Sequence, residues 1–111
     1  MSTLTTHVLD IARGHPAVGV AVRLERVGGD GTTHLAEAAT DRDGRVRDLG
    51  SGDLPTGRYR IVFGTGDYFA GLGDDVFYPT VAVEFSLTDP VAHYHVPLLV
   101  SPFGYSTYRG S

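Results

Sequence analysis

Hydrophobic and polar residues alternate along several short stretches of this chain. In residues 18–27 every second position up to Leu24 is apolar, and glycine, alanine and arginine occupy the positions between. The same period of two recurs in residues 58–63 and 80–87. Successive side chains of a strand point to opposite faces of its sheet, so this period predicts three half-buried β-strands.

Weaker patterns of the same kind predict further strands. These lie at residues 3–10, 34–40, 92–100 and 105–109, with a short one around 45–49. Turns rich in glycine and aspartate, such as residues 28–31 and 41–44, separate them. A single short helix is predicted at residues 67–72. Because helical crossover segments are missing, the pattern favours an all-β sandwich or barrel of antiparallel strands.

The composition agrees with a small β-domain. A length of 111 residues suits one domain spanning residues 1–111, and 41% of the residues are hydrophobic. Glycine (15) and proline (6) are scattered between the apolar runs, as in a domain with many turns. The chain has no cysteine and no lysine. This excludes disulfides, zinc–thiolate sites, thiolate nucleophiles and lysine Schiff bases.

The charge distribution and the N-terminal residues bear on partners and location. The formal net charge is -4 and the arginines are scattered, so no basic patch predicts binding to nucleic acid. No window approaches the roughly 20 apolar residues of a membrane span, so we expect no membrane partner. The first residues lack the basic and apolar regions of a secretory signal, and we therefore expect a cytoplasmic protein.

Two histidines one residue apart lie in the predicted strand 92–100. His93 and His95 would project from the same face, together with Pro97, because alternate side chains of a strand share a face. From spacing alone three roles stay open for them: a polar outer face, part of a metal site, or proton transfer near neutral pH. Pro97 cannot donate to a neighbouring strand, so we expect an irregularity there.

The other candidate residues are individually weak. His15, before a proline in a turn, and His34 are expected to have structural or surface roles. A lone strand histidine such as His7 is also more often structural than catalytic. Arg45 closes the turn 41–44, where it either supports a hairpin or presents a planar guanidinium to an anionic or carbonyl-rich ligand. Spacing does not choose between these roles.

The last residues, 101–111, are unusual for the end of a domain. They include the aromatic residues Phe103, Tyr105 and Tyr108 and finish in Tyr-Arg-Gly-Ser. Domain ends are ordinarily polar and poorly ordered. We therefore expect this segment to be anchored on the folded domain.

Several segments, taken together, resemble a known family. They are residues 5–10 (TTHVLD), 40–45 (TDRDGR), 66–69 (GDYF), 77–79 (FYP), 93–99 (HYHVPLL) and 108–111 (YRGS). In this order and spacing they are similar to the 5-hydroxyisourate hydrolases of the transthyretin-like family. Residues 9–14 (LDIARG) and 101–107 (SPFGYST) also resemble the transthyretin carriers. In that family His7, Arg45, His95 and the terminal tetrapeptide distinguish the enzymes from the carriers.

The resemblance implies a fold, an assembly and a reaction. The fold is a transthyretin-like β-sandwich of two four-stranded sheets with one short helix, assembled as a homotetramer with sites at the dimer–dimer interface. The substrate is 5-hydroxyisourate, a planar oxidised purine of urate degradation. Water opens its ring at an amide-like bond, giving 2-oxo-4-hydroxy-4-carboxy-5-ureidoimidazoline. The family mechanism uses no metal and no cofactor.

The family's site can be carried over residue by residue. It comprises the catalytic candidates His7, Arg45, His95 and Ser111, which also contact substrate, and the substrate-binding candidates Tyr108, Arg109 and Gly110. We favour His95 as the base that activates water, helped by His7, with His93 as a supporting partner. Two alternatives remain: a transthyretin-like small-molecule binding protein without activity, and a zinc-dependent hydrolase that uses His7, His93 and His95.

Overall fold

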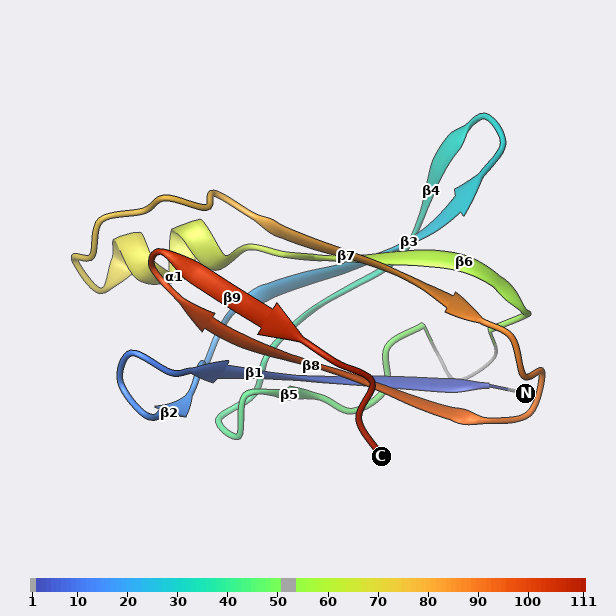
Figure 1. Cartoon of the computed structure of the whole chain (residues 1–111), viewed down its shortest axis with the longest axis horizontal. Coiled ribbons are helices and arrows are strands. Elements are labelled where there is room, and N and C mark those ends of the chain that lie inside the picture. The colour runs from blue at the N-terminus through green and yellow to red at the C-terminus, as the bar shows by residue number, and fades with distance from the viewer. Residues whose placement is uncertain (1, 51–53) are drawn as a thin grey trace.

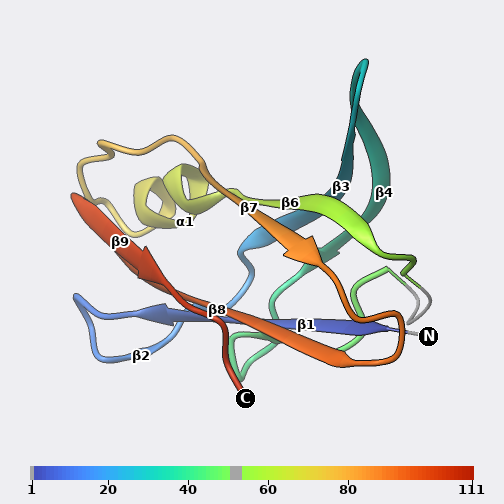
Figure 2. The same ribbon diagram turned by 45° about the vertical axis from the view of Figure 1, so that its right-hand side comes forward.

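Two β-sheets packed face to face form the molecule (Figures 1 and 2), seen in a computed structural model that describes residues 2–50 and 54–111. Along the chain the elements are β1 (Thr3–Asp10), β2 (His15–Pro16), β3 (Ala21–Gly28), β4 (Gly31–Ala39), β5 (Arg45–Val46), β6 (Gly57–Phe63), α1 (Thr65–Gly71), β7 (Val81–Leu87), β8 (His93–Ser101) and β9 (Gly104–Thr107). None of the helical residues described forms a helix long and apolar enough to cross a membrane.

The strand order confirms the predicted sandwich. One sheet runs β4-β3-β6-β7, and the other runs β2-β1-β8-β9, so each has a path of four strands. The two-residue strand β5 adds to the second sheet by pairing with β1. The expectation of antiparallel strands throughout is wrong for one pair: β1 and β8 are parallel, whereas every other pair of the strands described is antiparallel. The parallel pair carries three of the candidate residues, His7, His93 and His95.

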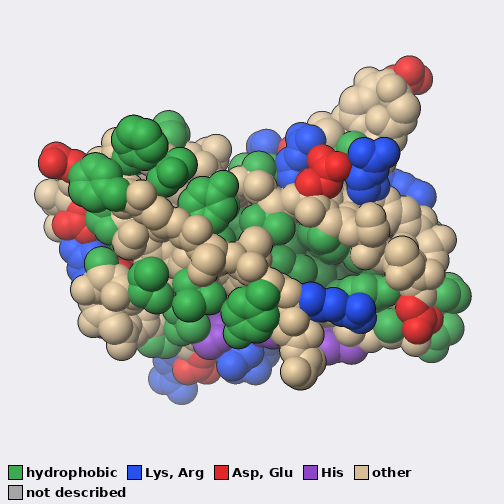
Figure 3. All heavy atoms as spheres, viewed as in Figure 1, with side chains coloured by type: hydrophobic (Ala, Val, Ile, Leu, Met, Phe, Trp, Pro, Cys, Tyr) green, Lys and Arg blue, Asp and Glu red, His purple; other side chains and the backbone are tan. Residues whose placement is uncertain are grey.

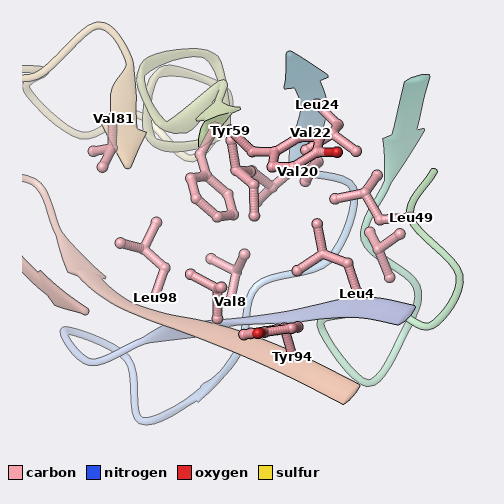
Figure 4. Packing of buried hydrophobic residues seen from close by; sticks show 14 of the residues in the cluster. Leu4, Val8, Val20, Val22, Leu24, Leu49, Tyr59, Val81, Tyr94 and Leu98 are labelled. Carbon is pink, nitrogen blue, oxygen red and sulfur yellow. The ribbon is translucent and has the colours of Figure 1, made fainter. Parts of the chain in front are cut away.

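The core fills the space between the sheets, as the period-two pattern predicts. Leu4 and Val8 of β1 point toward Val22 of β3 and Tyr59 of β6 (Figure 4), and all four side chains are buried. Their polar neighbours in sequence face outward. Each such aliphatic side chain stabilises the fold by about 1.5–3 kcal/mol relative to exposure. Because the core takes one face of β1 and β8, the side chains on the other face of these strands lie on the outside of the sheet.

Some element boundaries differ from the pattern-based ones. The strand predicted at 18–27 begins only at Ala21, because the chain turns at Gly19, whose φ of 78° suits glycine. Val18 is consequently 52% exposed. Strand β2 falls where a turn was expected, and the predicted strand 105–109 ends at Thr107. The helix begins two residues earlier than predicted, at Thr65.

A buried carboxylate ties the end of β1 to the helix. Asp10 is fully buried and accepts hydrogen bonds from the Tyr68 hydroxyl (2.8 Å) and from the Arg13 backbone N–H (3.0 Å). The Arg13 guanidinium lies 3.2 Å from Asp10 and 2.7 Å from Asp74. A buried charge is tolerated when it is paired and hydrogen-bonded in this way. The network thus joins β1, α1 and the segment after α1.

Candidate active site

The outer face of the β1–β8 pair carries a row of polar side chains. In β1 alternate residues are buried, which leaves Thr3, Thr5 and His7 outside. In β8 the same alternation holds from His93 to Val96 and is interrupted at Pro97, which is itself buried. The parallel register sets Thr3 beside His93, Thr5 beside His95 and His7 beside Pro97. The shared outer face predicted for His93, His95 and Pro97 is therefore observed.

A tight turn brings Arg45 to the same face. Strand β5 pairs with β1 so that Arg45 is opposite His7. The Asp41 carboxylate closes the turn by accepting hydrogen bonds from the backbone N–H groups of Asp43 (2.8 Å) and Arg45 (3.0 Å). At Gly44, with φ 75°, an added Cβ would lie 2.5 Å from the Val8 carbonyl oxygen. Only glycine lets the turn approach β1 so closely.

The tail after β9 returns to His95. The Gly110 N–H donates to the His95 carbonyl over 2.8 Å, an isolated bridge in the register of the β8–β9 ladder. Pro97 lies between this bridge and the end of the ladder, and because it has no N–H the pairing is interrupted there, which is the expected irregularity. The Pro97 carbonyl instead accepts a hydrogen bond from the Thr107 hydroxyl (2.6 Å). A Cβ added to Gly110 would lie 2.5 Å from Cδ2 of His95. The tail is anchored, as expected, and packs on the histidine ring.

Tyr108 and Arg109 contact a different part of the molecule. The Arg109 guanidinium carbon lies 4.5 Å from the centre of the Tyr94 ring, a cation–π contact. Both residues line a second hollow, of about 240 Å³, between β7 and the β8–tail segment. His95 also lines this hollow, whereas Ser111 lines a separate pocket with Arg45 and His95. Their predicted contact with substrate stays a prediction.

Arg45, His95 and Ser111 line one polar pocket of about 490 Å³. Its lining residues are Thr5, Thr6, Arg45, Val46, Arg47, His93, His95 and Ser111. His7 lies beside the pocket, opposite Arg45. Figure 3 shows histidine side chains with arginine along the lower edge of the molecule. The sequence reasoning missed Thr5 and Arg47; alternation along β1 was the signal for Thr5, which shares a face with His7.

Burial and a nearby positive charge lower the pKa of both central histidines. Burial lowers the pKa of His95, and the nearby positive charge of Arg45 and the imidazoles of His7 and His93 lower it further. The pKa of His7 is also lowered, first by burial and then by Arg45, although a hydrogen bond with the Asp43 backbone acts in the opposite direction. Neutral imidazoles can accept a proton at neutral pH.

The Arg45 guanidinium is available to a ligand. Within the described ranges no carboxylate forms an ion pair with it, whereas Arg47 pairs with Asp43 (3.2 Å) and Asp41 (3.7 Å). A planar guanidinium with free N–H groups can bind a carbonyl or a developing oxyanion by two parallel hydrogen bonds. The pocket therefore combines a proton acceptor with a fixed positive charge.

The other histidines make local contacts, as expected. His15 Nδ1 lies 2.9 Å from the Pro16 carbonyl, and His34 lies 3.6 Å from the Glu37 carboxylate. Among residues 2–50 and 54–111, no three His, Cys, Asp or Glu side chains are grouped to hold a metal ion. His7, His93 and His95, the ligands of the zinc alternative, therefore do not form such a group.

Comparison with known proteins agrees with this architecture. A 5-hydroxyisourate hydrolase of Caulobacter vibrioides is 51% identical, and the alignment covers 100% of both chains. The structure of Klebsiella pneumoniae 5-hydroxyisourate hydrolase superposes with a TM-score of 0.90 at 41% identity, covering 100% of both chains. Sea bream transthyretin in complex with thyroxine gives a TM-score of 0.91 at 32% identity, covering 97% of this chain and 94% of that one.

The family assignment follows from the match over nearly the whole chain. Residues 4–110 match the description "HIUase/Transthyretin family". This range includes both sheets, the turn that carries Arg45 and the tail up to Gly110. The chain therefore belongs to the HIUase/transthyretin family.

Proposed function

We propose that this chain is a hydrolase that opens the ring of 5-hydroxyisourate with water, in urate degradation. The observation that carries the proposal is the convergence of Arg45, His95 and Ser111 on one polar pocket beside His7. Full-length relatives at 47–51% identity carry the name of this activity. The product is 2-oxo-4-hydroxy-4-carboxy-5-ureidoimidazoline.

We assign a part of the reaction to each group on the basis of its position and chemistry. Neutral His95 removes a proton from water, and the resulting hydroxide adds to the carbonyl carbon of the amide-like bond. Arg45 orients the planar ring and stabilises the negative charge that develops on the carbonyl oxygen. When the carbon–nitrogen bond breaks, His95 gives the proton that it took from water to the leaving nitrogen. The carboxylic acid that forms loses its own proton to solvent and remains as a carboxylate. His7 and Ser111 complete the polar surroundings of the base.

The rival function is that of a non-catalytic carrier, since a transthyretin has the same fold. A ligand carrier of an apolar hormone needs a site lined mainly by apolar side chains. Here the pocket is lined instead by threonine, arginine, histidine and serine, with Val46 as its apolar member. Such a lining suits charge development in a reaction more than storage of an apolar ligand.

We also propose that the chain forms a homotetramer with its sites at the dimer–dimer interface. Among the residues that the structure describes, β7 and β9 each pair with a neighbour on one side only, so the free edge of each strand could pair with another chain. Large apolar side chains are exposed at the end that carries α1 and the β8–β9 turn (Figure 3). They include Phe77 (64%), Phe103 (66%) and Tyr105 (43%). Burial against further subunits would remove this surface from water.

The test follows the ultraviolet absorbance of freshly generated 5-hydroxyisourate. We expect the protein to accelerate its decay above the spontaneous rate, and the acceleration to survive exhaustive chelation. An unchanged decay rate would favour the carrier. Loss of turnover on chelation, restored by zinc, would favour the zinc alternative.

A further inference from the structure

Four side chains on the outer face of β1 and β8 form one hydrogen-bonded row. Thr3 Oγ1 lies 2.7 Å from His93 Nδ1, and His93 Nε2 lies 3.3 Å from Thr5 Oγ1. Thr5 Oγ1 in turn lies 2.7 Å from His95 Nδ1. The parallel register produces the row, because it pairs Thr3 with His93 and Thr5 with His95. The row leads from His95 in the pocket to Thr3, which is exposed to solvent.

The hydrogen bonds of this row can all run in one direction or all in the other, because each side chain has one proton to donate. A neutral imidazole has one N–H, and a threonine hydroxyl has one O–H. If His95 Nδ1–H donates to Thr5, then Thr5 donates to His93 Nε2, and His93 Nδ1–H donates to Thr3. His95 Nε2 is then an unprotonated acceptor, which is the form a general base needs. In the reverse orientation every proton points the other way, and His95 Nε2 carries a hydrogen.

We propose that Thr5, His93 and Thr3 form a proton relay that holds His95 in its basic tautomer and carries the abstracted proton to solvent. The inference rests on the proposed hydrolase function. As His95 Nε2 takes a proton from water, its Nδ1 proton passes to Thr5, and the Thr5 hydroxyl proton passes to His93 Nε2. The His93 Nδ1 proton passes to Thr3, which releases its own hydroxyl proton to solvent.

Every member of the relay is neutral before and after this step. One proton has left the attacking water, one has entered solvent, and the row has reversed its orientation. When the ring nitrogen leaves, His95 Nε2–H donates a proton to it. The row then returns to its first orientation by taking a proton from solvent at Thr3, so the cycle closes.

The charges around His95 favour such a relay. Arg45 and Arg47 face the pocket from β5 and the residue after it, His7 lies on β1, and His93 is on the strand of His95 itself. If His95 became positively charged, the guanidinium of Arg45 would repel it, in keeping with the lowered pKa of this histidine. Moving the proton out along the row avoids that repulsion.

The test compares Thr5→Val, which keeps the shape of the side chain and removes its hydroxyl, with Thr5→Ser, which restores a hydroxyl. We expect Thr5→Val to lower kcat about tenfold or more with little change in KM, and Thr5→Ser to recover most of the loss. His93→Phe, at an exposed position, should lower kcat as well. Thr33→Val, on the exposed surface of β4, is the matched control and should behave as wild type.

Two further readouts separate a relay from a structural role. The dependence of kcat on the fraction of D₂O should be curved in the wild type, because several protons move, and linear in Thr5→Val. Imidazole ¹⁵N spectra at about pH 8, above the usual histidine pKa, should show His95 protonated at Nδ1 in the wild type and as a mixture of tautomers in Thr5→Val.

Each contrary result overturns the relay. A kcat equal to that of the wild type in Thr5→Val or in His93→Phe would be such a result. So would a kcat of Thr5→Ser no higher than that of Thr5→Val. A wild type that fails to accelerate hydroxyisourate decay would instead reject the proposed function. In that case the ¹⁵N spectra still decide whether Thr5 fixes the tautomer of His95.

Discussion

At the residue scale, the central feature is a neutral imidazole beside a fixed positive charge. Burial and Arg45 both disfavour protonation of His95, so its lone pair is available at neutral pH. Arg45 therefore has two effects in this account: it attracts the developing oxyanion, and it keeps the base unprotonated. A sequence shows the residue types for this arrangement, but their mutual effect depends on the register of β1 with β5 and β8.

The pH dependence of kcat/KM tests this arrangement. Because the neutral form of His95 is the active one and its pKa is lowered, kcat/KM should rise with pH, with a midpoint below the usual histidine value of about 6.5. It should be level at neutral pH, and protonation should abolish it at low pH. The measurement is initial rates across this range, corrected for spontaneous decay. A midpoint above the usual value would contradict the assignment.

We predict that catalysis requires glycine at position 110, because this residue packs against His95, the proposed base. In Gly110→Ala the new Cβ would lie 2.5 Å from His95 Cδ2, so the ring must shift. A displacement of about 1 Å at a reacting group can cost roughly 100-fold in rate, so we expect a loss of that order in kcat with the fold retained. Gly71→Ala is the control, since its Cβ would meet nothing within 4 Å. Equal kcat in both variants would show that the tail does not position His95.

At the element scale, the alternating pattern predicts the strands well and their ends poorly. The faces of β1, β6 and β8 follow directly from alternation, because the core takes one face of each strand. The two-residue strands β2 and β5 are set by backbone pairing with β1, which a local pattern does not contain. Likewise, Tyr108 and Gly110 belong to one motif, yet only the pairing of the tail with β8 shows that Gly110 is the one that touches His95.

The link between β1 and α1 carries a stability prediction. Tyr68→Phe removes the hydroxyl that donates to the buried Asp10 carboxylate. Burial, followed by this hydrogen bond, raises the pKa of Tyr68 to about 12, so the hydroxyl keeps its proton. Loss of a hydrogen bond to a charged group should lower the free energy of unfolding by about 1.5–3 kcal/mol. Denaturant titration at a fixed subunit concentration measures it.

Tyr105→Phe provides the comparison for this variant. Within the described chain the Tyr105 hydroxyl has no hydrogen-bond partner, so its removal should change the free energy of unfolding by less than about 0.5 kcal/mol. If Tyr68→Phe were as stable as Tyr105→Phe, the buried network would not be holding the helix to β1.

At the scale of the whole molecule, the single chain exposes surfaces that suit assembly with further subunits. The unpaired edges of β7 and β9 and the exposed aromatic residues predict association. Sedimentation equilibrium should give a mass of about four chains, and activity should fall on dilution as the tetramer dissociates. A fully active monomer would contradict the shared-site assembly, although not the hydrolase itself.

The most direct test of His95 as the general base is the turnover of 5-hydroxyisourate by His95→Asn. Asparagine keeps polarity but cannot act as a general base, so kcat should fall by roughly 10²- to 10⁴-fold at an unchanged oligomeric state. His34→Asn, on β4 and outside the pocket, should retain the wild-type rate. Equal rates for the two variants would show that the pocket formed by β1, β5, β8 and the tail is not where the reaction takes place.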